Sequence, residues 1–209
     1  MDLDMKKIFL ILTSLLFITS TVFPQSKMNI KYLDEYGGKK FKQNDDKPFT
    51  GIAFDLSKET GNKISETKYV KGVPHGKHIE WNNDGKKTVD GKYKHGKKDG
   101  LSTFWYENGQ KEEGNYTDGK KNGTWMHWDL NGSKILDEKF ENGILNGPMI
   151  SWYPNGQKEM VILWENGKKR NLEYWNENGE AINISPFNSF PIMELLDGKR
   201  ALETLQKSE

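Results

Sequence analysis

Cysteine is missing from this chain of 209 residues. Its absence excludes disulfide bonds, thiolate nucleophiles, cysteine-ligated zinc and a lipid-modified cysteine anchor, so the protein is not expected to be a lipoprotein. Net charge is also nearly absent, because 31 Lys and Arg balance 30 Asp and Glu to leave a formal charge of +1. The chain therefore has no global attraction to nucleic acid or to a membrane, and we expect no nucleic-acid partner.

Apolar residues are few, at 34% of the chain, although aromatic residues make up 12%. This is little apolar material for a thick core. The aromatic content argues against disorder. Together these values favour an ordered but thin and extended architecture.

Motifs of common enzymes are absent as well. The sequence contains no nucleophile elbow, no Walker loop, no zinc-binding His-Glu-x-x-His and no dinucleotide-binding glycine motif. The histidines have no cysteine or converging carboxylates to complete a metal site, so His75, His78, His95 and His127 are interpreted as surface residues. We therefore expect a protein that is not an enzyme, without catalytic residues, cofactor or metal.

The first 26 residues differ from the rest. A basic pair, Lys6 and Lys7, precedes an apolar stretch over residues 8–23 and a polar exit that begins at Pro24. This order is typical of a secretory signal peptide, and the stretch is shorter than the roughly 20 apolar residues of a membrane-spanning helix. Residues 1–26 are predicted to be cleaved, with an uncleaved N-terminal anchor as the alternative. The mature protein is then exported to the periplasm, the outer envelope or the medium.

Glycine and tryptophan, by contrast, are regularly spaced. Five of the seven tryptophans lie 24, 23, 24 and 23 residues apart, at Trp81, Trp105, Trp128, Trp152 and Trp175. A turn glycine follows each of them by four residues, and the same glycine register extends back to Gly61 and Gly38. A second class of glycine closes each unit. Internal self-similarity at this period indicates a repeat protein.

Each unit has the pattern of a β-hairpin. In one unit, a strand-like segment at 101–106 is followed by a turn at Gly109 and a returning segment at 110–117. Frequent glycine and the lack of a 3.6-residue apolar period exclude helix. Because an isolated hairpin is marginal in water, neighbouring units must pair edge to edge. The predicted fold is all-β, an elongated single-layer antiparallel sheet of about seven hairpins.

Three segments complete the predicted organisation. Residues 27–47 form a degenerate N-terminal repeat or cap, and residues 48–184 form the repeat domain. Residues 185–209 leave the register, and they are expected to form a linker and a short C-terminal helix, in which Leu195 and Leu202 have roughly helical spacing. This helix would cap the last edge strand or, as the alternative, dock a partner.

The units resemble the bacterial variant of the MORN repeat, as seen in YENGQKEEGNYTDGKKNG, YPNGQKEMVILWENGKKRN and WNNDGKKTVDGKYKHGKKDG. The resemblance covers residues 48–180 clearly and 28–47 weakly. The variant occurs in exported bacterial repeat proteins and in the YwqK-type antitoxins of toxin–antitoxin systems. It implies an elongated antiparallel sheet used for protein or lipid contacts, and it transfers no catalytic residues.

Strand alternation divides the aromatic residues between two faces. The file of five regularly spaced tryptophans is expected to be a structural spine that fills the thin sheet, or alternatively an exposed strip that grips a partner chain or a glycan. Alternation points a second set at the opposite face. This set supplies the candidate binding residues Phe104, Tyr106, Trp125, Tyr153 and Tyr174.

The loops that join successive hairpins lie along one edge, and three of the five are basic. The basic residues are Lys97, Lys98, Lys120, Lys121, Lys168, Lys169 and Arg170. They are interpreted as solvated turns or, alternatively, as a cationic edge that docks on anionic lipid or acidic envelope polymer.

These observations predict an exported, non-enzymatic repeat protein that serves as a protein-binding or scaffold module in the bacterial envelope, with an unknown protein partner. One alternative is an antitoxin or immunity protein that neutralises a toxin by direct contact. Another is a module that binds anionic membrane surfaces through its basic edge. Weak self-association is left open.

Overall fold

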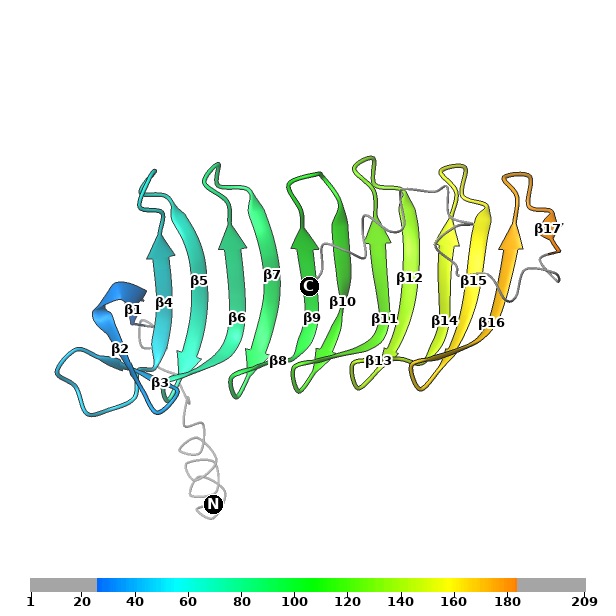
Figure 1. Cartoon of the computed structure of the whole chain (residues 1–209). Coiled ribbons are helices and arrows are strands. Elements are labelled where there is room, and N and C mark those ends of the chain that lie inside the picture. Colours follow the sequence, from blue (N-terminus) through cyan, green and yellow to red (C-terminus); the bar gives the residue numbers. More distant parts are fainter. Residues whose placement is uncertain (1–25, 184–209) are drawn as a thin grey trace, which may run out of the picture.

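The computed structural model describes residues 26–183, and strands make up 64% of the structure. One long antiparallel sheet holds almost all of them (Figure 1), so the predicted all-β sheet of hairpins is confirmed. The helical structure among the described residues is one 3-10 turn, η1 (Ile30–Tyr32), and no helix there is long and apolar enough to cross a membrane. The predicted C-terminal helix and, apart from Ser26, the predicted signal peptide lie outside the described residues.

The strands follow one another across the sheet in chain order. The 15-stranded main sheet contains β1 (Lys27–Asn29), β4 (Gly51–Leu56), β5 (Lys63–Val70), β6 (Val73–Trp81), β7 (Lys87–Lys94), β8 (Lys97–Lys98), β9 (Gly100–Trp105), β10 (Lys111–Thr117), β11 (Lys120–Trp128), β12 (Lys134–Glu141), β13 (Ile144–Leu145), β14 (Gly147–Trp152), β15 (Lys158–Glu165), β16 (Lys168–Trp175) and β17 (Ala181–Ile182). A separate two-stranded sheet contains β2 (Leu33–Tyr36) and β3 (Lys39–Lys42). Each hairpin of the main sheet therefore pairs with the edge of the one before it.

The upper turns, at the top of Figure 1, join the two strands of one hairpin. Between β9 and β10, the Tyr106 N–H donates to the Gln110 carbonyl at 3.0 Å, and the Gly109 N–H donates to the Tyr106 carbonyl at 3.0 Å. Gly109 has a φ of +84°, which a residue with a side chain rarely adopts. This short hairpin loop with a left-handed glycine explains the first class of glycine.

The lower turns join one hairpin to the next and use two residues. Asp118 (φ +50°) and Gly119 (φ +85°) connect β10 to β11, with Thr117 and Lys120 as the closing pair. Two successive left-handed residues make the primed turn, whose twist matches that of paired strands. Each lower turn is also bonded to the unit before it, since the Gly119 N–H donates to the Lys98 carbonyl at 2.8 Å.

One residue in each unit caps the lower turn of the next unit. Asp99 accepts a hydrogen bond at 3.4 Å from the Asp118 N–H, and Asn146 accepts one at 3.3 Å from the Asn166 N–H. Thr50, His75 and Asn122 hold the same position. These bonds were not predicted from the sequence, although a hydrogen-bonding side chain before each closing glycine was their signal.

The N-terminal end of the sheet is built differently. β1 pairs with β4 in parallel, with Met28 opposite Ala53, and the β2–β3 hairpin stands apart from the main sheet. Leu33 of β2 packs with Phe49, Ala53 and Tyr69 in a small core. Residues 27–42 thus contribute one strand to the edge of β4 and the apolar side chains of Met28, Ile30 and Leu33 to the core beside it.

The main sheet has two distinct faces. One, which we call the ladder face, carries the file of Trp81, Trp105, Trp128, Trp152 and Trp175. The other, which we call the buried face, carries most of the buried side chains between β9 and β15. These are Ser102, Glu112, Trp125, His127, Leu136, Glu138, Met149, Ser151, Met160 and Ile162. The closest packing is therefore on the face opposite the tryptophan file.

Candidate interaction surfaces

On the ladder face, tryptophans alternate with lysines from strand to strand. Trp128 of β11 lies opposite Lys111 of β10 and Lys134 of β12. The Lys111 ammonium lies 4.2 Å from the centre of the Trp128 ring, and the Lys134 ammonium lies 3.8 Å from the centre of the Trp152 ring. The same contact joins Lys63 to Trp81, Lys87 to Trp105 and Lys158 to Trp175. The row is a series of cation–π contacts along the sheet.

Four of these lysines also pair with an acidic residue of their own strand. The nitrogen–oxygen distances are 2.8 Å for Lys63–Glu66, 2.7 Å for Lys87–Asp90, 3.1 Å for Lys111–Glu113 and 2.9 Å for Lys134–Asp137. The hydrogen bond from Lys63 is the main reason that the pKa of Glu66 lies below its ordinary value. Tryptophan, lysine and acid thus form a ladder in which each of these four lysines has both a ring and a carboxylate as partners.

The ladder tryptophans are not a filled core. Trp105 is 36% exposed, and the other four are half-buried. The tryptophan file is therefore only partly buried, and the least exposed side chains lie on the opposite face. The stacking of lysines on the rings was not predicted from the sequence. Its signal was a lysine two residues after each of five upper-turn glycines, Gly61, Gly85, Gly109, Gly132 and Gly156.

Trp125 lies at the centre of the buried face and has 0% of its surface exposed. Its ring stacks on Phe104 with 6.2 Å between ring centres, meets Tyr116 edge-on at 4.9 Å and lies against Gly114, where an added Cβ atom would overlap it. Its Nε1 donates to the Asn115 carbonyl at 3.1 Å. The prediction of Trp125 as an exposed binding residue is therefore wrong, because the ring fills the space that Gly114 leaves.

The other four candidate binding residues do not form an exposed strip. Phe104 and Tyr174 are half-buried on the buried face. Tyr106 and Tyr153 begin upper turns, and the Tyr153 hydroxyl donates to the Trp175 carbonyl at 3.0 Å. Of the five candidates, Tyr106 is the most exposed, at 45%.

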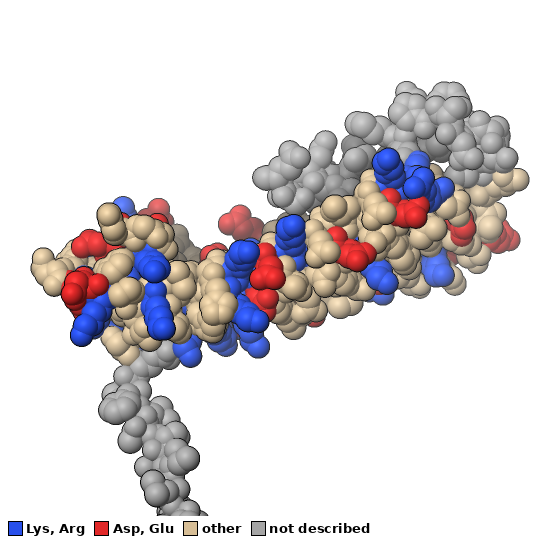
Figure 2. All heavy atoms as spheres, turned by 90° about the horizontal axis from the view of Figure 1, so that it is seen from below, with Lys and Arg blue, Asp and Glu red and all other residues tan. Residues whose placement is uncertain are grey.

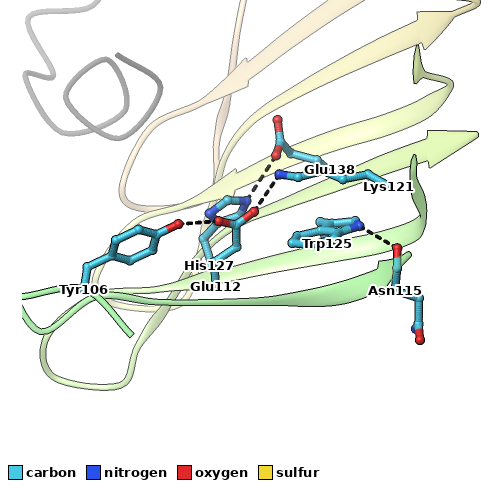
Figure 3. A network of polar contacts seen from close by, with 7 residues as sticks. All are labelled: Tyr106, Glu112, Asn115, Lys121, Trp125, His127 and Glu138. Atoms are coloured by element: carbon cyan, nitrogen blue, oxygen red, sulfur yellow. Dashed lines mark hydrogen bonds and ion pairs between the residues drawn. The ribbon is translucent and has the colours of Figure 1, made fainter. Parts of the chain in front are cut away.

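A polar network lies beside Trp125 on the buried face (Figure 3). The Glu112 carboxylate accepts one hydrogen bond from the Tyr106 hydroxyl and one from the Lys121 ammonium, both at 2.6 Å. The Lys121 ammonium also lies 4.1 Å from the centre of the Trp125 ring. Lys121 therefore ties a nearly buried carboxylate to the central aromatic ring.

Burial and hydrogen bonding act in opposite directions on Glu112. Burial raises its pKa, but the hydrogen bonds from Lys121 and Tyr106 outweigh burial and hold the pKa below its ordinary value. Burial, and then the hydrogen bond to Glu112, raises the pKa of Tyr106 above its ordinary value. Burial and the nearby Glu112 charge raise the pKa of Tyr116 to about 12. At neutral pH the carboxylate is therefore ionised and both hydroxyls are protonated.

Acidification is expected to destabilise the sheet through Glu112. Because its pKa is lower in the folded state, the unfolded state binds more protons once the pH falls below the unfolded value near 4.5. The free energy of unfolding then decreases as the pH drops through the folded pKa. Urea unfolding measured from neutral to acid pH checks this, and the Glu112→Gln variant should be less stable at neutral pH with a flatter pH dependence. Parallel curves for the two proteins would contradict the assignment.

His127 and Glu138 form a second polar pair next to the network. The His127 Nε2 atom lies 3.1 Å from the Glu138 carboxylate, and the two residues are 8% and 5% exposed. The interpretation of His127 as a surface residue is therefore wrong. At the lower edge, the rings of His75 and His95 are 5.0 Å apart. Within residues 26–183, no group of three or more histidine or acidic side chains is arranged to hold a metal ion.

The lower edge carries both signs of charge, with lysines set among acidic groups (Figure 2). Lys98 and Lys121 contact aromatic rings of the buried face, and Arg170 pairs with Glu165 at 2.6 Å. The other members of the predicted basic edge, Lys97, Lys120, Lys168 and Lys169, are exposed. The cationic edge is therefore smaller than the sequence predicted, because alternation turns some of its lysines onto a face.

Comparison with known proteins gives no assignment. No family model matches the chain, and no curated protein matches it.

Proposed function

We propose that this chain is an exported, non-enzymatic repeat protein that acts as a protein-binding or scaffold module in the bacterial envelope. The observation that carries the proposal is the repeated sheet, in which one hairpin unit recurs so that each face and edge presents side chains at regular spacing. Repeat arrays of this kind offer extended surfaces to partner proteins. Export rests on the basic and apolar pattern of residues 1–26.

Many of the titratable side chains of the sheet bond to other side chains, which indicates that they stabilise the sheet. Tyr106 and Lys121 both donate hydrogen bonds to Glu112, and four of the ladder lysines pair with an acid of their own strand. Groups held in this way join neighbouring strands and fix their side chains. A rigid surface of this kind suits recognition of a partner.

Intact masses of the native protein from cytosolic, periplasmic and medium fractions test export. A species outside the cytoplasm that lacks roughly 20 to 26 N-terminal residues supports the proposal. A full-length cytosolic species would contradict it. Crosslinking within the fraction that holds the protein then tests binding, with defined protein adducts as the expected result.

The alternative function is that of an antitoxin or immunity protein, which neutralises a toxin by direct contact. The resemblance to YwqK-type antitoxins favours it. A full-length cytosolic species would direct the search to an intracellular toxin. Binding of anionic lipid by the lower edge has less support, since Lys98 and Lys121 are turned onto the buried face and Arg170 is paired with Glu165.

A further inference from the structure

The hairpin β14–β15 breaks the pattern of the ladder face. In the four hairpins before it, the acid that pairs with the ladder lysine is Glu66, Asp90, Glu113 or Asp137. The residue two positions after each of these acids is also polar: Lys68, Lys92, Asn115 or Lys139. In β15 these two positions hold Val161 and Leu163. A repeat that abandons its polar pattern in one unit points to a function of that unit.

Val161 and Leu163 complete an apolar block on the ladder face. Val161 lies opposite Ile150, and Leu163 lies opposite Pro148 on β14. Leu163 is 45% exposed, Pro148 is exposed, and Ile150 and Val161 are half-buried. Four apolar side chains are therefore neighbours on this face, and two of them, Val161 and Leu163, stand where the second strand of the four earlier hairpins presents polar groups. Exposed apolar patches edged by polar residues mark interaction sites.

The same change deprives Lys158 of the carboxylate that the other ladder lysines have. Its ammonium lies 5.9 Å from the centre of the Trp175 ring, close to the 5.8 Å between Lys87 and Trp105. Among residues 26–183 it forms no salt bridge, whereas Lys134, one hairpin earlier, lies 2.9 Å from Asp137. Glu173, which lies opposite Val161 on β16, accepts a hydrogen bond from the Asn171 amide at 2.8 Å and forms no salt bridge with Lys158. The Lys158 ammonium is thus a positive group beside an apolar block, which is complementary to a carboxylate beside an apolar side chain.

We propose that this block, formed by Pro148, Ile150, Val161 and Leu163 together with Lys158, is the docking site for a segment of a partner protein in which an aspartate or glutamate accompanies an apolar side chain. The partner carboxylate takes the place that the strand's own acid holds in the other hairpins, and the apolar side chain covers Leu163. The inference rests on the proposed function, because it names the surface and the partner chemistry of the binding module.

Site-specific photo-crosslinking in the native bacterium tests the docking site. A photoreactive amino acid replaces Leu163 in one protein and Leu101 in a matched control. Leu101 lies on the ladder face of β9, where Pro148 lies on β14, and is 50% exposed. We expect a protein adduct from position 163 and none from position 101. Peptide sequencing should place the crosslink in a segment where an acidic residue neighbours an apolar one.

A substitution that restores the repeat pattern gives the second readout. Val161→Glu supplies Lys158 with a carboxylate of its own strand. Because Glu173 lies opposite position 161 on β16, where two facing carboxylates would repel each other, the variant also carries Glu173→Gln. With the photoreactive residue at 163, it should lower the adduct yield about tenfold or more. Val161→Ile with the same Glu173→Gln change, which keeps the apolar surface, should leave the yield unchanged. Circular dichroism of each purified protein confirms that the sheet is intact.

Several outcomes would overturn the docking site. The first is an equal yield of adducts from positions 163 and 101. The second is an adduct from position 163 with the chain's own residues, with a second copy of the chain or with lipid. The third is an adduct yield that the Val161→Glu variant does not change. If position 163 gives no protein adduct but positions 106 or 120 do, the docking site fails and the binding function stands. If no position on the sheet gives a protein adduct, the binding function fails as well.

Discussion

Replacement of Trp125 by alanine is expected to lower the free energy of unfolding by about 3–5 kcal/mol, the usual cost of removing a buried aromatic side chain. The ring is fully buried and packs against Phe104, Tyr116 and Gly114. Alanine leaves a cavity that close-packed neighbours fill only by shifting the strands. Urea unfolding followed by circular dichroism measures the change.

The matched control is Trp105→Ala, one hairpin earlier on the ladder face. Because Trp105 is 36% exposed, its replacement should cost only about 1 kcal/mol. Gly114→Ala is an independent check, since the added methyl group overlaps the Trp125 ring and should cost about 1–3 kcal/mol. Equal losses for the two tryptophans would show that the buried face is not the main source of stability.

Replacement of Lys121 by methionine is expected to cost about 2–3 kcal/mol. Removal of one partner of a buried ion pair costs about 3–5 kcal/mol, and the value is reduced here because the Lys121 side chain is 28% exposed while that of Glu112 is 8% exposed. Methionine keeps an apolar contact with the Trp125 ring. The Glu112 carboxylate is then left with the hydrogen bond from Tyr106. Urea unfolding at neutral pH gives the loss.

Lys98→Met serves as the control for this substitution. Lys98 holds the same position one hairpin earlier, and its ammonium lies 5.0 Å from the Phe104 ring centre and 5.1 Å from that of Tyr116. We expect a loss of about 1 kcal/mol or less, because a ring contact is removed without leaving a buried carboxylate. Acid pH, which protonates Glu112, should reduce the loss in Lys121→Met. A loss that stays constant with pH would assign the stabilisation to the ring contact.

The hairpin repeat was predictable because glycine has a conformational role at both kinds of turn. Gly109 and Gly119 have φ values of +84° and +85°, which other residues rarely adopt. Their spacing therefore marks where each strand ends without any knowledge of tertiary contacts. Export and the C-terminal helix stay predictions, since they concern residues outside 26–183.

The candidate site was less predictable, because strand alternation assigns side chains to two faces but does not show which face is buried. Both faces of this sheet carry aromatic rings, lysines and carboxylates, so composition does not show which one packs. Trp125 and His127 were assigned to exposed positions and are buried. The apolar departure at Val161 and Leu163 was visible in the sequence, but the strand register was needed to align it with the acidic and polar positions of the other hairpins.

By itself, the sequence determined the repeated hairpin, its period and the division of the aromatic residues between two faces, because turn glycines and strand alternation are local properties of the chain. Only the tertiary structure decided which face is buried. That outcome depends on contacts between strands: the Trp125 ring fits because Gly114 of the neighbouring strand has no side chain, and Lys121 reaches Glu112 across the same pair of strands. It also decided that the lysines of one hairpin stack on the tryptophans of the next.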